Sequence, residues 1–443
     1  MTSTIEQVRA RVADQKTRQP ELYGGIDFSA TPERFTDDPA NSVAPASVAG
    51  AAPTPQHIAL VRAYTLLGDR VADAYAGLMP QHGFRGLIAM LTKACDGGLE
   101  AVPDAPPELI AFIRDMEHVP DWLDMDLVRQ GARLDRNAMA NLSPFAIRGA
   151  FVATFMNKYA ALPMALTGTL GAETAARRVN ETASFFTTTL LPGALERHGP
   201  GFKAAAMVRL MHSMVRFNAL RRPGAWDAKV YGVPIPQVDQ MPAGLIPIFL
   251  LSYKLLRQGR TTFTPAERAR VELARYRCYL LGLPEDLLAD TPVGIVQTMS
   301  ARNQTLRRGF DDDTCGVLVR ATLAAYLPPD RSWRNRLFDT VERGFAKVFF
   351  VRHFMGGDPA AAGRMGVKIT AGDRALFLLV AVIVTSRMAA YGLALKIPGL
   401  RTLADRDLVR QLRGHLARYG HAEFTTDAAQ YRPTRPSAEP VAA

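Results

Sequence analysis

Apolar residues recur at steps of three and four residues along most of the chain after Gln56. The stretch HIALVRAYTLLGDRVADAYAGLM, which begins at His57, shows the period of a helix that buries one face. Proline and glycine residues end such stretches, and neither an alternating strand pattern nor a G-x-G-x-x-G motif is present. The sequence therefore predicts an all-α fold: a helical bundle of a dozen or more helices with long irregular connections.

This pattern divides the chain into three regions. Residues 1–55 form a polar arm with a short helix over 4–19, which we expect to lie across the main body. Residues 56–422 form one helical domain, and the Pro-rich residues 423–443 a disordered tail. The predicted helices of the domain are 57–79, 84–94, 106–117, 124–136, 144–167 with an interruption at Pro163, 173–190, 204–222, 246–256, 265–281, 293–306, 314–326 and 334–354.

The charge and the cysteines restrict the function. The net charge of +11 comes mainly from arginines that are dispersed rather than clustered, which argues against a nucleic-acid surface but allows contact with an anionic membrane. Cys95, Cys278 and Cys315 are far apart and form no C-x-x-C pair, which fits a reducing compartment. The first residues show no secretory signal. We expect a cytoplasmic protein, with membrane association left open.

The segment 375–397 is the most apolar part of the chain. Its uninterrupted apolar run, from Ala375 to Val384, covers about ten residues, whereas a membrane span needs about 20. Arg387 follows shortly after this run. We therefore predict a buried core helix, with a helix at the membrane edge as the alternative.

One histidine lies in the middle of the apolar helix predicted over 204–222. Arg209, His212 and Arg216 occupy positions i, i+3 and i+7, so they project from one side of that helix. A neutral imidazole in apolar surroundings can bind haem iron, and each arginine can pair with a propionate. The alternative is a core histidine held by a backbone carbonyl, with arginines that reach solvent.

A second group of polar residues lies on the preceding helix. Arg178, Glu181 and Thr182 share one face, and Phe185 and Phe186 follow them. In a functional interpretation Arg178 binds a cofactor carboxylate, the other two are polar groups in an apolar cavity, and the aromatic rings form its wall. The alternative is a surface ion pair between Arg178 and Glu181, worth under about 1 kcal/mol.

Other chemistries lack their motifs. The chain has no G-x-S-x-G nucleophile turn and no H-E-x-x-H zinc motif. The remaining seven histidines are scattered, so no site with two or three histidine ligands can be derived from spacing. A single histidine favours haem, because the porphyrin supplies the other four ligands.

These residues together resemble the latex clearing protein (rubber oxygenase) and MpaB-type oxygenase superfamily. The resemblance depends on R-x-x-H-x-x-x-R around His212 and on R-x-x-x-T about thirty residues upstream, at Arg178 and Thr182. Looser matches are VPDW at 119–122, GLP at 282–284 and DTP at 290–292. The resemblance covers about residues 56–326.

The resemblance implies a globin-like helical arrangement that holds haem b, with His212 as the proximal iron ligand. Arg178 and Thr182 would lie near the haem and the substrate channel, and Arg209 and Arg216 would steady the propionates or the helix. It also implies an oxygenase that uses dioxygen on an apolar, isoprenoid-type substrate such as a prenyl chain.

One position departs from the family pattern. Latex clearing proteins have a lysine three residues after the matched arginine, whereas this chain has Glu181. A carboxylate is a poor ligand of ferrous haem, so Glu181 either acts as a base toward an allylic proton or pairs with Arg178. The second functional hypothesis is a helical lipid- or membrane-associated binding protein that keeps the fold without catalysis.

Overall fold

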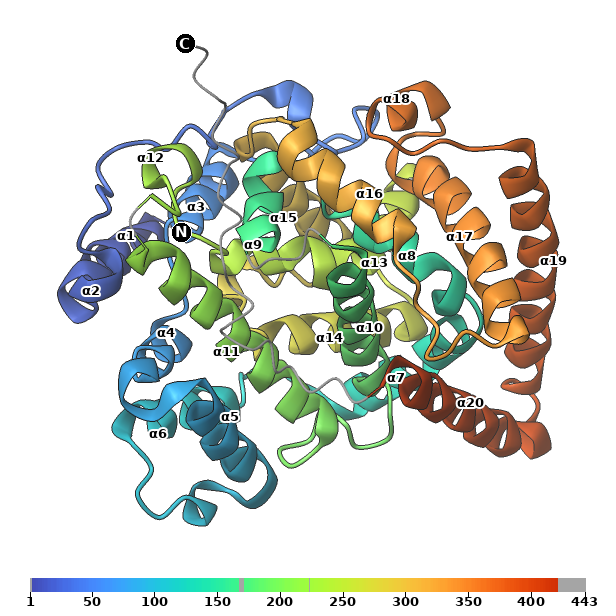
Figure 1. Cartoon of the computed structure of the whole chain (residues 1–443), viewed down its shortest axis with the longest axis horizontal. Helices are drawn as coiled ribbons and strands as arrows, with labels where there is room; N and C mark the ends of the chain where they lie inside the picture. Colours follow the sequence, from blue (N-terminus) through green and yellow to red (C-terminus); the bar gives the residue numbers. More distant parts are fainter. Residues whose placement is uncertain (1, 167–170, 223, 421–443) are drawn as a thin grey trace, which may run out of the picture.

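The computed structural model describes residues 2–166, 171–222 and 224–420, and this part of the chain consists of helices and the loops that connect them (Figure 1). The only β-type contact in these ranges is an isolated bridge between Phe35 and Leu306. The predicted all-α fold of a dozen or more helices is therefore confirmed. The predicted tail 423–443 lies outside the described residues.

The α-helices are α1 (Thr2–Arg18), α2 (Pro20–Tyr23), α3 (Pro55–Thr65), α4 (Arg70–Ala76), α5 (Met79–Gly97), α6 (Pro107–Glu117), α7 (Met125–Asn141), α8 (Ser143–Ala153), α9 (Lys158–Leu166), α10 (Ala172–Thr188), α11 (Pro200–Arg221), α12 (Ala228–Tyr231), α13 (Met241–Arg257), α14 (Pro265–Leu280), α15 (Pro292–Thr305), α16 (Val317–Ala324), α17 (Trp333–Phe354), α18 (Pro359–Arg364), α19 (Ala371–Ala394) and α20 (Pro398–Tyr419).

Prolines and side-chain caps set many of the helix starts. α14 begins with a reciprocal capping box, in which the hydroxyl of Thr264 accepts from the backbone N–H of Glu267 and the Glu267 carboxylate accepts from the N–H of Thr264. α15 begins at Pro292, after Thr291 accepts from the backbone N–H of Gly294 at 3.1 Å. These caps satisfy donors that the first helical turn leaves unpaired.

The segment predicted as one helix with an interruption at Pro163 is organised differently. Pro163 lies inside α9, and the chain instead breaks between Ala153 and Lys158. At that break the side chain of Asn157 accepts from the backbone N–H of Tyr159 at 3.0 Å, which caps the start of α9. The capping residue, rather than the proline, therefore sets the boundary.

α11 is the central helix of the fold. Fifteen of its 22 residues are buried, so side chains on almost every face pack against other helices. It contacts α4 and α5 on one side and α10 and α14 on the other, and in Figure 1 it runs between the α4–α6 group and the rest of the bundle. An apolar helix of this kind is a core helix.

The N-terminal arm packs against the main body. α1 covers the predicted helix at 4–19, and its residues Val8 and Val12 are buried in one apolar cluster with Val61 and Tyr64 of α3. Tertiary contacts therefore hold the arm in place, and its polar composition alone does not predict them.

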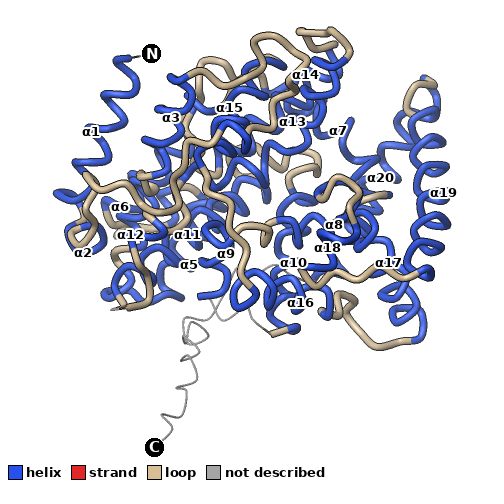
Figure 2. The backbone as a smooth tube through the Cα atoms, turned by 90° about the horizontal axis from the view of Figure 1, so that it is seen from above, coloured by secondary structure: helices blue, strands red, loops and turns tan. Residues whose placement is uncertain are grey.

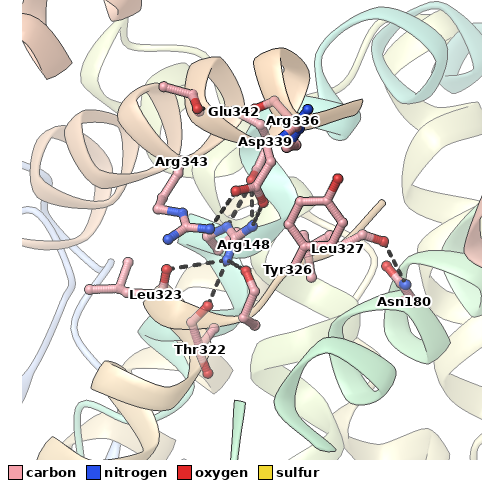
Figure 3. A network of polar contacts seen from close by, with 12 residues as sticks. Arg148, Asn180, Thr322, Leu323, Tyr326, Leu327, Arg336, Asp339, Glu342 and Arg343 are labelled. Atoms are coloured by element: carbon pink, nitrogen blue, oxygen red, sulfur yellow. Dashed lines mark hydrogen bonds and ion pairs between the residues drawn. The ribbon is translucent and has the colours of Figure 1, made fainter. Parts of the chain in front are cut away.

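A buried arginine joins α8, α16 and α17 (Figure 3). The guanidinium of Arg148 lies 2.7 Å from a carboxylate oxygen of Glu342 and 3.2 Å from one of Asp339. It also donates to the carbonyls of Thr322 and Ala325, at 2.8 and 2.7 Å. These carbonyls lie at the end of α16, where a helix leaves acceptors unpaired, so the arginine satisfies both them and the two acids.

The prediction that 375–397 is a buried core helix is wrong. α19 lies at the edge of the molecule in both views (Figures 1 and 2), and it is the one described helix long and apolar enough to cross a membrane. Only 17% of its most apolar stretch is buried. The run length of apolar residues in a sequence does not reveal how many neighbouring helices are available to cover them, and here one stripe packs on α17.

Candidate functional site

His212 lies in the middle of α11. Protein atoms surround it, and part of its surface is accessible to solvent. Burial, together with the positive charges of Arg216 and Arg178, lowers the pKa of His212 to about 4. The imidazole is therefore neutral at pH 7. The neutral ring is the form that binds a metal ion.

Gln240 is the polar partner of this ring. It ends the short 3-10 helix Gln237–Gln240, is buried, and places its side-chain amide 2.7 Å from Nδ1 of His212. The nearest amide atom is the nitrogen Nε2 of Gln240, which as placed donates to Nδ1. With the amide turned by 180°, its oxygen accepts from Nδ1–H instead, and Nε2 of the ring is then available to a ligand, an arrangement common to metal-bound histidines.

Arg178 and Glu181 lie on α10 and contact each other weakly. Their closest nitrogen and oxygen atoms are 3.7 Å apart. Among the described residues, buried Nε and Nη2 of Arg178 and Oε1 of Glu181 have no hydrogen-bond partner. Burial raises the pKa of Glu181, and the charge of Arg178 only partly opposes this. Unpaired buried polar atoms are costly, so the pair fits a site where a ligand supplies the missing partners.

α10 and α11 pack together, which brings the two predicted groups into one region. The charge of Arg178 is close enough to contribute to the lowered pKa of His212. Thr182 lies one turn beyond Arg178 on the same face of α10 and is partly exposed. Of the predicted polar residues of α10, Arg178 is the one whose charge acts on the histidine.

The two phenylalanines of α10 have different environments. Their rings meet edge to face at 5.2 Å between centroids, and Phe185 is buried in the largest apolar cluster. Phe186 is partly buried, and the guanidinium of Arg277 on α14 lies 4.9 Å from its ring centre. Arg277 has a buried Nε without a partner among the described residues. The aromatic wall stays a prediction, and Arg277 is a polar neighbour that the spacing did not indicate.

Arg209 and Arg216 have carboxylate partners within the protein. Arg209 is buried and pairs with Asp69 at the start of α4 and, at 2.7 Å, with Asp115 of α6. Arg216 pairs with buried Asp73 of α4 at 3.0 Å. These pairs neutralise both charges within the protein and fit the second role considered for the arginines, which is to steady the helix, whereas binding of propionates stays a prediction.

The loop before Gln240 is fastened by the same arginine. Nη1 of Arg216 donates to the backbone carbonyls of Pro234 and Ile235, at 3.1 and 2.7 Å. Ile235 has a φ of +43°, a backbone conformation that a β-branched residue rarely adopts. The hydrogen bonds from Arg216 therefore hold the strained residue Ile235 in place, five positions before Gln240, whose amide contacts His212.

Close packing surrounds these ion pairs. A Cβ atom at Gly68 would lie 1.9 Å from the hydroxyl of Tyr23, which itself donates to Asp73 at 2.5 Å. Gly282 has a φ of +85°, and a Cβ atom there would lie 2.7 Å from Nε of Arg209. Only glycine fits at either position, so the GLP motif at 282–284 allows the Arg209 pair to form.

The residues described here contain no group of three or more His, Cys, Asp or Glu side chains that could hold a metal ion. A cavity of about 1190 Å³ opens between α1, α4 and α6, and Arg209 lines it but His212 does not. A metal at His212 would therefore have to bring most of its own ligands, as the iron of haem does.

The fold and the site together define a class of protein: an all-helical bundle whose central helix carries a neutral histidine, His212. A solved structure of latex clearing protein in its closed state has this fold: it aligns with a TM-score of 0.54 and 17% sequence identity, over 80% of this chain and 91% of that chain. No curated protein matches the chain.

The family described as ER-bound oxygenase mpaB/B'/rubber oxygenase, catalytic domain, matches residues 136–386, which is more than half of the chain. The chain belongs to this family of oxygenases. The resemblance drawn from the residues around His212 and Arg178 is thereby confirmed, and the match extends beyond it, into α19.

Proposed function

We propose that the chain is a haem b-dependent oxygenase that acts on an apolar, isoprenoid-type substrate with dioxygen. The observation that carries the proposal is the environment of His212: a neutral, partly accessible imidazole on the central helix whose Nδ1 is engaged by Gln240. Membership of the oxygenase family supports the reaction class.

The residues present fit haem. Nε2 of His212 would hold the iron once the Gln240 amide presents its oxygen to Nδ1–H, and the unpaired donors of Arg178 would suit a carboxylate such as a propionate. When bound, haem supplies the iron at which dioxygen is activated. Glu181, whose pKa is raised by burial, can hold a proton at Oε1 or take one from an allylic carbon, and Thr182 is the adjacent polar group on that face.

The test is an absorption spectrum. Protein expressed with added haem should show a Soret band, which His212→Ala should lose and added imidazole should restore. The control is His198→Ala, since His198 lies on a loop and contacts the carbonyl of Cys95. A colourless wild-type protein, or a Soret band unchanged by His212→Ala, would overturn the proposal.

Turnover is measured separately. Oxygen uptake with squalene or a C20 prenyl alcohol in detergent, together with the appearance of carbonyl products, should follow the haem content of the sample. Glu181→Gln should lower the rate at least tenfold with the Soret band retained, because it removes a proton acceptor.

The second candidate is a lipid- or membrane-associated binding protein without catalysis. Glu181, where the family pattern has lysine, and the exposed apolar helix α19 favour it. Haem loading without oxygen uptake on any prenyl substrate would support this alternative.

A further inference from the structure

α19 and the start of α20 carry a continuous set of exposed apolar side chains. These residues, which we call the α19–α20 face, are Leu378, Leu379, Val382, Ile383, Leu393, Ile397, Leu400 and Leu403, and each is 41–64% exposed. Leu378, Leu379, Val382 and Ile383 recur at three- and four-residue steps and so lie along one stripe, and Leu393 follows on the same side of α19 ten residues later. An apolar surface of this extent on a folded protein marks a site of interaction.

The opposite stripe of α19 is fixed to the body of the protein. Phe377, Val380 and Val384 are buried in one cluster with Phe345 and Val348 of α17. Among the described helices only α19 is long and apolar enough to cross a bilayer, so α17 would not cross with it and α19 would have to leave α17 in order to span. The helix, about 36 Å long, can instead lie flat with its exposed stripe in an interface.

Arg387 also ties α19 to α7. Its Nε donates to the side-chain oxygen of Asn141 at 2.8 Å, and Nη2 contacts Gln411 of α20 at 3.0 Å. Although Arg387 is exposed, its guanidinium is thus turned toward α7 and α20, and the exposed polar residues next to it, Thr385 and Ser386, carry no charge.

The charge around the face has one sign. Residues 374–404 contain Arg374, Arg387, Lys396 and Arg401 and no Asp or Glu. Arg374 lies near one end of α19 and Lys396 and Arg401 lie at the other, and all three are exposed. The next acid along the chain, Asp405, is paired with Arg136 at 2.7 Å. Cations at both ends of an apolar stripe complement anionic lipid headgroups.

We propose that the α19–α20 face docks the protein on an anionic lipid bilayer, with α19 parallel to the membrane plane. A second copy of this chain is a poorer occupant, because stacking two such faces brings arginine and lysine ends together without a carboxylate to pair with them. The proposal is independent of haem binding and of turnover.

Vesicle flotation of the full chain tests it. Wild-type protein should float with phosphatidylcholine vesicles that contain 30% phosphatidylglycerol, bind pure phosphatidylcholine at least tenfold less, and release in high salt. Leu379→Asp should weaken binding to the anionic vesicles at least tenfold. The matched control is Leu250→Asp on α13, because Leu250 is 50% exposed and Leu379 58%.

A second variant tests the charge. Lys396→Gln with Arg401→Gln leaves the apolar stripe intact and should remove most of the preference for phosphatidylglycerol. Light scattering and circular dichroism of every variant check assembly and folding. Wild-type protein that does not float, equal losses for Leu379→Asp and Leu250→Asp, or a dimer that Leu379→Asp dissociates would each overturn the proposal.

Discussion

Lowering the pH should destabilise the fold through His212. The group has a pKa of 6.5 when unfolded and about 4 when folded, because burial disfavours its charged form. The unfolded chain therefore binds the proton more tightly, so this contribution is fully present above pH 6.5 and is lost as the pH falls toward 4. Between pH 7.5 and pH 5 the free energy of unfolding should drop by about 2 kcal/mol from this residue alone.

Urea unfolding of the haem-free protein, followed by circular dichroism at both pH values, measures the drop. Carboxylates and other histidines also titrate in this range, so the comparison is with His212→Gln, which should lose about 2 kcal/mol less than wild type between pH 7.5 and 5. His82→Gln, a change at an exposed histidine, should keep the wild-type dependence. If wild type and His212→Gln lost the same free energy of unfolding between pH 7.5 and 5, the lowered pKa of His212 would be refuted.

Three further changes test the surroundings of the site. Arg216→Met leaves Asp73 buried without its cation, so the free energy of unfolding in urea should fall by about 3–5 kcal/mol, and a fall below about 1 kcal/mol would contradict the pairing. Gln240→Leu removes the partner of the His212 ring and should weaken haem binding at least tenfold in a Soret titration; an unchanged Kd would show that the amide is dispensable. Ile235→Gly relieves the positive φ and should stabilise the protein by about 1 kcal/mol in thermal unfolding, whereas a lower Tm would argue against strain.

The helical fold and the two functional helices could be predicted because their signals are local. The spacing of Arg178 and Thr182, and that of His212 and its flanking arginines, follows from the helical period alone. The period also identified α11 as apolar, although not as the helix at the centre of the bundle.

What could not be predicted depends on contacts between distant parts of the chain. Asp69 and Asp73 lie about 140 residues before the arginines they neutralise, and Gln240 lies 28 residues after the histidine it contacts. No periodic pattern reports such pairings, so the arginines could not be assigned to a carboxylate of the protein rather than to one of a ligand. The exposure of α19 is hidden for the same reason.

The ion pairs between α11 and α4 bear on what the smallest working form of this protein can be. The family match begins at residue 136, whereas both aspartates that neutralise Arg209 and Arg216 precede it. A chain shortened to residues 136–386 would lose α4–α6 together with these aspartates, which would expose one side of α11 and leave Arg209 and Arg216 without their partners. We therefore expect residues 136–386 not to fold on their own, because the histidine helix α11 packs against an N-terminal region that the family match does not include.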